Sequence, residues 1–149
     1  MRINSFADLC LRMVMLIAST PPGAQFTTRE ISAGVHTPYN HVSKAVLRLR
    51  DLGVVNVYRG RNGGVQLSPV GRNISVGWLL RELDTRIDMA DCESLEVACP
   101  LSNNCRLRHA LNSAREAFYA SLDSIVLADL PHEEQMKPVF ESIGLRPGL

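Results

Sequence analysis

The sequence predicts a mainly α-helical protein with one small β-hairpin, arranged as a winged helix-turn-helix domain, a cysteine-containing loop and a long helix. Two observations support this fold class. Residues 27–53 read as two short helices joined by a tight turn, and a glycine-rich hairpin follows them directly. Three of the four cysteines crowd into residues 92–105, just before the longest helical pattern. The chain therefore combines a domain of a nucleic-acid-binding type with a group of thiols.

Length and composition are those of one globular domain with an appendage. Of the 149 residues, 46% are hydrophobic and 21% are charged, which is ordinary for a soluble protein. No apolar run reaches the ~20 residues that a membrane-spanning helix needs. The apolar segment 9–18 has helical spacing and contains Arg12, which favours an amphipathic helix over a signal peptide. We therefore expect a cytoplasmic protein without a membrane segment, whose thiols stay reduced.

The formal net charge of +1 hides an uneven distribution. Residues 1–64 hold eight Lys or Arg against three Asp or Glu, a net charge of +5. Residues 65–105 hold three against six, and residues 106–149 hold five against six. A basic first half on a nearly neutral chain fits a nucleic-acid-binding face joined to a different kind of region.

The first predicted helix begins with a capping box, in which Ser5 is the N-cap and Asp8 is the acid that reaches back. Its apolar residues recur at helical spacing, and the helix should end near residues 19–20, before Pro21. Cys10 lies on this apolar stripe, so we expect a buried core thiol.

The helix-turn-helix is predicted from two start signals. Residues 27–30 form a second capping box, and Thr37 followed by Pro38 gives an N-cap with proline at the first helical position. The second, recognition helix should span about residues 38–52 and stop at Gly53. The wing should span about residues 54–67, with β-prone segments on both sides of the glycine-rich turn 59–64.

Ten residues of the helix-turn-helix and wing are candidate DNA contacts. Polar side chains near the start of a recognition helix meet base edges, and arginines on a narrow wing can enter a minor groove. The alternatives are an ordinary solvated helix face and a flexible basic loop. The candidates are Thr37, Tyr39, Asn40, His41, Lys44, Arg48, Arg59, Arg61, Asn62 and Gly63.

The rest of the chain is predicted to contain two further helices. One should begin at Ser68-Pro69, with Val70, Ile74 and Trp78 inward, and should close a DNA-binding domain at residues 1–83. An irregular acidic loop should follow at residues 84–105, then a dimerisation helix at residues 106–128. The proline-containing residues 129–149 should form a loosely ordered tail.

The three clustered cysteines, Cys92, Cys99 and Cys105, indicate metal or iron–sulfur ligation, because such crowding in a cytosolic protein rarely serves disulfides. Cys105 would lie at a helix N-terminus, which favours a thiolate and an anionic cluster. A tetrahedral zinc site that also uses His109 is an alternative, although the gaps between the cysteines exceed those usual for zinc. No catalytic arrangement stands out, so we expect no enzyme. A winged helix used for protein contacts remains the competing class.

Taken together, these motifs resemble the winged-helix iron–sulfur repressors of the Rrf2 family, over about residues 1–130. Within that family they are most similar to the nitric-oxide-sensing repressors. The segments that carry the resemblance are Ser5-Phe6-x-Asp8, the wing turn 59–64, and residues 77–83, 105–107 and 128–130.

The resemblance implies a homodimer that binds a palindromic operator in double-stranded DNA and releases it when nitric oxide reacts with a [4Fe-4S] cluster. It implies that Cys92, Cys99 and Cys105 hold the cluster together with Asp8 from the other subunit, and that the regulated genes encode nitric-oxide-detoxifying enzymes. A sister branch with a [2Fe-2S] cluster, which responds to iron–sulfur or redox status, uses a histidine three residues after the last cysteine. This chain has Arg108 at that position, which disfavours that branch.

Overall fold

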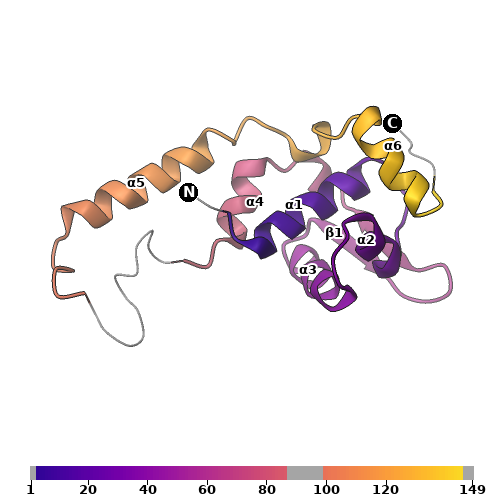
Figure 1. Ribbon diagram of the computed structural model, residues 1–149, viewed down its shortest axis with the longest axis horizontal. Helices are drawn as coiled ribbons and strands as arrows, with labels where there is room; N and C mark the ends of the chain where they lie inside the picture. Colours follow the sequence, from indigo (N-terminus) through magenta and orange to yellow (C-terminus); the bar gives the residue numbers. More distant parts are fainter. Residues whose placement is uncertain (1–2, 87–98, 146–149) are drawn as a thin grey trace.

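The computed structural model describes residues 3–86 and 99–145. It confirms the predicted fold class, with helices as the main elements and a two-stranded antiparallel hairpin (Figure 1). No helix among these described residues is long and apolar enough to cross a membrane. The elements in chain order are α1 (Ser5–Ala18), α2 (Thr28–Gly34), α3 (Tyr39–Asp51), β1 (Val55–Tyr58), β2 (Gly64–Leu67), η1 (Gly71–Asn73), α4 (Val76–Leu83), α5 (Arg106–Ala120), η2 (Leu127–Asp129) and α6 (Glu133–Ser142).

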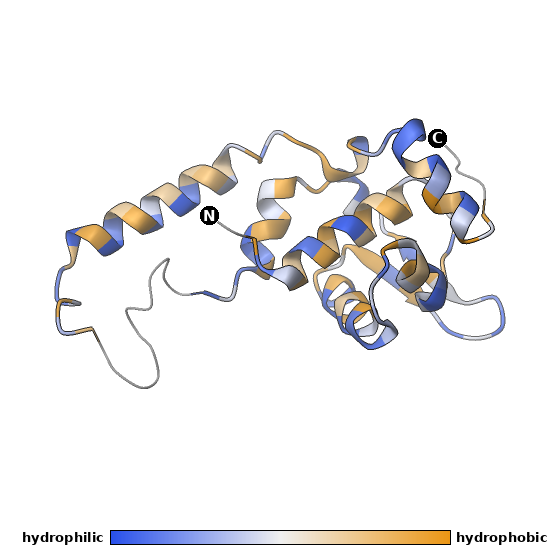
Figure 2. Ribbon diagram, in the orientation of Figure 1, coloured by the Kyte–Doolittle hydropathy of each residue, from blue (hydrophilic) through white to orange (hydrophobic). Residues whose placement is uncertain are grey.

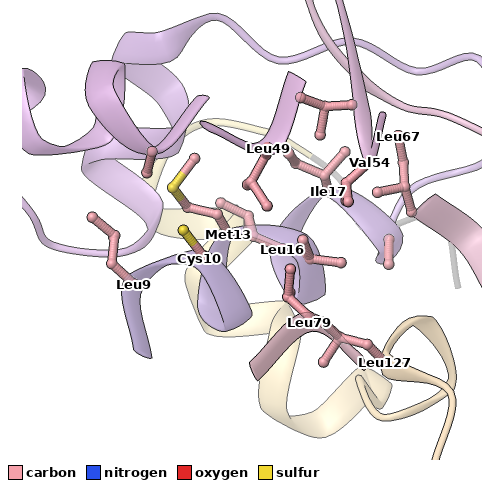
Figure 3. Close-up of a cluster of buried hydrophobic side chains, with 14 of the residues drawn as sticks. Leu9, Cys10, Met13, Leu16, Ile17, Leu49, Val54, Leu67, Leu79 and Leu127 are labelled. Atoms are coloured by element: carbon pink, nitrogen blue, oxygen red, sulfur yellow. The ribbon is translucent and has the colours of Figure 1, made fainter. Parts of the chain in front are cut away.

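Helix α1 lies at the centre of the core (Figure 3). Its apolar positions recur at helical spacing, so one face packs against α3, α4, β2 and η2. Met13 and Val14 are completely buried, and Leu49, Leu79 and Leu127 close the core around them. Cys10 is also buried in this core, as its place on the apolar stripe predicted. Burial raises the pKa of the Cys10 thiol to about 12.

The start of α1 differs from the prediction. Asn4, not Ser5, is the N-cap, and its side-chain oxygen accepts a hydrogen bond from the Ala7 amide at 2.6 Å. Asn4 caps as well as Ser does, so the helix starts with Ser5 as its first residue. The side chain of Asp8 is therefore not used in a capping box. It pairs with Arg12 one turn later, at 2.8 Å.

The helix-turn-helix is present as predicted, but its second start signal was misread. The capping box of Thr27 and Glu30 is confirmed, with hydrogen bonds in both directions. At α3 the N-cap is Pro38, and Thr37 makes no cap; its hydroxyl donates to the Val35 carbonyl at 3.2 Å. Gly53 has a φ of +73°, the left-handed conformation that ends a helix.

The wing is the hairpin β1–β2, in which Val55 pairs with Leu67 and Tyr58 with Gly64. Phe26 adds an isolated bridge to Val65, which ties the hairpin to the segment before α2. Gly63 is required at the turn, because a Cβ there would lie 2.3 Å from the Tyr58 carbonyl oxygen.

The single helix predicted from Ser68-Pro69 is in fact two elements, η1 and α4. Ser68 is buried, donates to the Gly53 carbonyl at 2.6 Å and accepts from the Gly71 amide at 2.8 Å. The backbone turns extended at Ile74, and Ser75 caps α4. Val70, predicted to point inward, is 60% exposed.

Helix α5 is shorter than the predicted 106–128 and projects away from the body of the molecule (Figure 1). It ends at Ala120, and the following residues run through turns to an isolated bridge between Ser75 and Val126. The apolar positions expected to continue the helical stripe, Leu122 and Ile125, instead pack against the core from this irregular segment.

The expectation of a loosely ordered tail after residue 129 is wrong for residues 133–142, which form α6. Met136 and Phe140 are buried, and the Phe140 ring meets Phe26 edge-on with 6.0 Å between centroids. Proline was misleading here. Pro138 lies inside the helix at an exposed position, and burial of Phe140 outweighs the lost backbone hydrogen bond.

Candidate DNA-binding surface and cysteine loop

The recognition helix α3 presents a polar face to solvent at its N-terminal end. Val42, Ala45 and Leu49 are fully buried, which fixes the rotation of the helix. The opposite face exposes Tyr39 and, with it, a set of three polar side chains. These are Asn40, His41 and Lys44. The arrangement gives this end of α3 the donors and acceptors that can meet base edges in a major groove.

Two of the side chains predicted to contact DNA already donate hydrogen bonds within the chain. Thr37 is half-buried and donates to the Val35 carbonyl. Arg48 lies near the other end of α3, where its Nη2 donates to the Glu82 carbonyl of α4 at 2.7 Å. The structure therefore separates Arg48 from the group at the start of the helix.

The wing places Arg59, Arg61 and Asn62 in exposed positions around a turn closed by the Gly63 amide, which donates to the Gly60 carbonyl at 3.0 Å. Gly60 has a φ of +102°, so the turn needs glycine at this position. The wing is thus narrow and carries two guanidinium groups, a shape and charge suited to a minor groove.

Arg29 was missed by the sequence reasoning. It lies in the first turn of α2, and its guanidinium lies over the Tyr39 ring at 5.9 Å from the centroid. It brings a further positive charge to the start of the recognition helix. Only the packing of α2 on α3 reveals this contact, because the two residues are ten positions apart and no spacing rule pairs them.

The cysteine group is described in part, since Cys92 lies outside the described residues. Cys99 and Cys105 are both half-buried free thiols. Cys105 is the N-cap of α5, and its sulfur accepts from the Arg108 amide at 3.5 Å. Within the described ranges, 3–86 and 99–145, no three His, Cys, Asp or Glu side chains gather as a metal site.

The Cys105 sulfur is suited to binding a metal as a thiolate. A helix N-terminus with an amide directed at the sulfur stabilises negative charge there. The donor set of thiols and a carboxylate also suits iron. The thiols of Cys99 and Cys105 therefore fit, in their chemistry, the iron–sulfur cluster that the sequence predicts.

Asp8 lies at the exposed start of α1 and lines an open hollow with Ile3, Asn4 and Ser5. Its side chain is 55% exposed, so a second molecule can reach it. Arg12, its partner, also donates to the Val35 carbonyl at 3.3 Å. Asp8 is thereby linked through Arg12 to the turn between α2 and α3.

Arg81 of α4 binds the C-terminal half of α5 and the turn after it through charged hydrogen bonds. Arg81 binds both carboxylate oxygens of Asp123, at 2.6 and 2.8 Å, and donates to Glu116 at 2.8 Å. These hydrogen bonds to Arg81 lower the pKa of Asp123. Gly77 permits the close approach, because a Cβ there would lie 2.3 Å from the Tyr119 carbonyl oxygen.

A second contact fixes the point where the predicted loop leaves α4. The Asp84 side chain is only 7% exposed; it accepts from the Tyr119 hydroxyl and pairs with Arg86 at 2.8 Å. Burial alone would raise the pKa of Asp84, but the hydrogen bonds from Arg86 and Tyr119 outweigh it and lower the pKa to about 2. The end of α4, where the predicted loop begins, is therefore bound to α5 through Tyr119.

An exposed apolar stripe runs along α5. Leu107 is 67% exposed, and Ala110, Ala114 and Ala117 are exposed as well. Figure 2 shows apolar stretches along this projecting helix. An apolar stripe on a helix that stands away from its own domain is typical of helix pairing between two chains.

Comparison with known proteins gives consistent matches. Residues 3–133 match the Rrf2 family, described as an iron-dependent transcriptional regulator. The HTH-type transcriptional repressor NsrR of Streptomyces coelicolor is 48% identical over 131 residues, which cover 87% of this chain and 88% of that protein.

Solved structures share the fold. CymR (YrzC), the global cysteine regulator of B. subtilis, is 26% identical with a TM-score of 0.62 and covers 87% of this chain and 95% of its own. T. potens IscR, 20% identical, has a TM-score of 0.63 over 87% of this chain and 85% of its own.

Proposed function

Because this chain belongs to the Rrf2 family of iron-dependent transcriptional regulators, we propose that it is a homodimeric repressor that releases its operator in response to nitric oxide, through a [4Fe-4S] cluster. It is a DNA-binding transcriptional regulator and not an enzyme, as its sequence predicted. The observation that supports the fuller proposal best is that the polar start of α3, the arginine wing and the thiols beside α5 occur on one chain.

We propose that α3 reads the major groove with the residues at its exposed end. Asn40 can bind an adenine edge, and Lys44 can meet guanine or phosphate. Thr37, Tyr39 and His41 adjoin them at the start of the helix. Arg59, Arg61, Asn62 and Gly63 of the wing reach the adjacent minor groove. Two such heads related by twofold symmetry fit a palindromic operator with half-sites ~34 Å apart.

The exposed apolar stripe of α5 supports a dimer in which the long helices of two copies pair. Pairing would remove Leu107 from water and bring two winged heads under one symmetry axis. Such a dimer also brings residues of one copy near the thiols of the other.

Cys92, Cys99 and Cys105 would hold the cluster, with Asp8 of the partner subunit as the fourth ligand. When bound, a cluster with one oxygen ligand supplies an iron that is more open to a small molecule such as nitric oxide. The chain's own residues provide the connection to DNA. Arg12 pairs with Asp8 at 2.8 Å and donates to the Val35 carbonyl at 3.3 Å. A change in the position of Asp8 would therefore shift Arg12 and, through it, the turn before α3. Derepression of nitric-oxide-detoxification genes is the proposed result.

The experiment uses the full chain purified without oxygen. The protein should be coloured by a cluster and should enrich one palindromic duplex from a random pool. Arg61→Ala should bind that duplex more weakly at matched salt, whereas an unchanged affinity would remove the wing from the proposal.

Asp8→Ala tests the fourth ligand and should alter either the visible spectrum or the reaction with nitric oxide. Asp51→Ala, another exposed acid on the surface of the head, is the matched control and should alter neither. An Asp8→Ala spectrum and reaction identical to those of the wild type would mean that Asp8 only pairs with Arg12. A colourless protein with one zinc per chain would support a zinc site instead.

A further inference from the structure

Arg48 holds the far end of the recognition helix to α4. Its guanidinium donates to the Glu82 carbonyl at 2.7 Å, in the last turn of α4. Carbonyls in the last turn of a helix have no partner within the helix and carry partial negative charge, so a cation there is favourable. The Asp84 amide donates a hydrogen bond to the Leu80 carbonyl, and the Arg48 guanidinium donates one to the Glu82 carbonyl.

The same short segment is held from the other side by α5. Asp84 accepts from the Tyr119 hydroxyl, and the Arg115 guanidinium donates to the Arg86 carbonyl at 2.9 Å. Residues 82–86, which we term the junction, therefore contact the recognition helix on one side and α5 on the other. The predicted cysteine loop begins in the junction.

Charged hydrogen bonds and close backbone packing join α4 to α5 and to the turn that follows it. Arg81 binds Asp123 and Glu116, and Gly77 lets the backbones approach closely. A shift of α5 therefore moves the end of α4, and with it the carbonyl that Arg48 holds. The contact of Arg48 is a mechanical link between α5 and the orientation of α3.

We infer that Arg48 is a positioning residue, which sets the orientation of the recognition helix through the junction and Tyr119 and does not touch DNA. This inference rests on the proposed function, because it concerns how the DNA-binding head is oriented. It gives Arg48 a role different from that of Lys44, which lies one turn earlier on α3; both side chains are exposed, but Arg48 is the one that donates to the Glu82 carbonyl.

Salt dependence separates the two roles. A residue that contacts phosphate contributes to the slope of log affinity against log salt, whereas a positioning residue lowers affinity without changing that slope. The probe is the duplex that the wild-type full chain enriches from a random pool, measured from low to high KCl. Arg48→Ala should weaken binding roughly threefold to tenfold with the slope of the wild type. Lys44→Ala, the matched control, should lower the slope by about 1. Arg48→Lys, which keeps a donor for the carbonyl, should restore most of the affinity.

Tyr119→Phe tests the other side of the junction. It removes only the hydroxyl that binds Asp84, on a helix away from the recognition helix, and should also weaken binding. In the double variant Arg48→Ala/Tyr119→Phe, the fold-loss of affinity should be smaller than the product of the two single fold-losses. The reason is that both substitutions break the same connection between α5 and α3. Thermal unfolding of each variant accompanies the measurement, and the inference expects similar midpoints for Arg48→Ala and Lys44→Ala.

Two results would overturn the inference while leaving the proposed function intact. One is a slope reduced by about 1 in Arg48→Ala, which would make Arg48 a phosphate contact. The other is a double variant whose loss equals the product of the single losses. A wild-type chain that enriches no duplex would overturn the proposed function and this inference together.

Discussion

The winged-helix head and the first half of α5 differ in how deeply their apolar side chains are buried. In the head, α1 is surrounded by α3, α4, the wing and η2, and Met13, Leu49 and Leu79 are fully buried. The first half of α5 stands away from this core with Leu107 exposed to solvent (Figures 1 and 2). The head therefore buries its apolar side chains within one copy, whereas α5 leaves the side chain of Leu107 in water.

If the account is right, changes around the thiols and α5 abolish cofactor binding or assembly and leave the head folded. Changes in the head should instead cost stability.

The largest effect is expected at the thiols. Cys105→Ala should lose the iron and the visible absorbance of the anaerobically purified protein almost completely, because three thiolates are needed to hold the cluster. Cys10→Ala is the control and should keep both, because the Cys10 thiol is buried with a raised pKa. Equal iron content in the two variants would remove the distinction between structural and ligating thiols.

The next effect concerns assembly. Leu107→Glu should weaken the dimer at least ~10-fold, because it places a charge in the apolar stripe that pairing would bury. Because Leu107 is exposed, the substitution should change the free energy of unfolding of a single chain very little. His109→Glu adds the same charge on a face of α5 away from Leu107, Ala110 and Ala114 and should leave the dimer intact. Sedimentation measures the mass of each variant in solution, which is compared with 16.5 kDa for one chain. A Leu107→Glu protein that remains dimeric would place the interface elsewhere.

A third prediction tests whether α6 belongs to the head. Phe140→Ala should destabilise the protein by about 3–5 kcal/mol, the usual cost of removing a fully buried phenyl ring. Glu141→Ala, at an exposed neighbouring position, should change little. Chemical denaturation measures both. A Phe140→Ala protein as stable as the wild type would mean that α6 adds no core to the head.

The smallest effect is expected at Asp84, with a defined pH dependence. Its pKa is lowered to about 2, so its stabilising contribution is fully present above its ordinary pKa and is lost as pH falls from that value through the lowered pKa. Asp84→Asn should therefore be about 1–2 kcal/mol less stable than the wild type at pH 7. The difference should shrink between pH 4 and pH 2, as measured by denaturation at each pH. A difference independent of pH would indicate lost packing and not lost charge.

Sequence patterns predicted the elements of the head because each has a local physical cause. The capping box of Thr27, the left-handed stop at Gly53 and the glycine turn at Gly63 all depend on neighbouring residues. The errors lie where several local signals compete or where packing decides. At α1, both Asn4 and Ser5 can serve as the N-cap. At the C-terminal end, Pro138 suggested a loose tail, but the ring of Phe140 packs against that of Phe26.

The candidate site could be predicted only in its residue types. Clustered cysteines and an arginine wing are visible in the sequence, but the partner of a side chain is not. The contacts of Arg48 with Glu82 and of Arg29 with Tyr39 join residues on different helices. No spacing rule connects such pairs, because they are set by how α2, α3 and α4 pack together.

The central claim is that the thiol region of one dimer controls how tightly its winged heads hold DNA. The most direct test measures the affinity of the anaerobically purified dimer for its enriched duplex before and after addition of nitric oxide at fixed salt. The account predicts a coloured protein whose affinity falls at least ~10-fold on reaction. An iron-free dimer, or one that reacts with nitric oxide and binds the duplex as tightly as before, would contradict it.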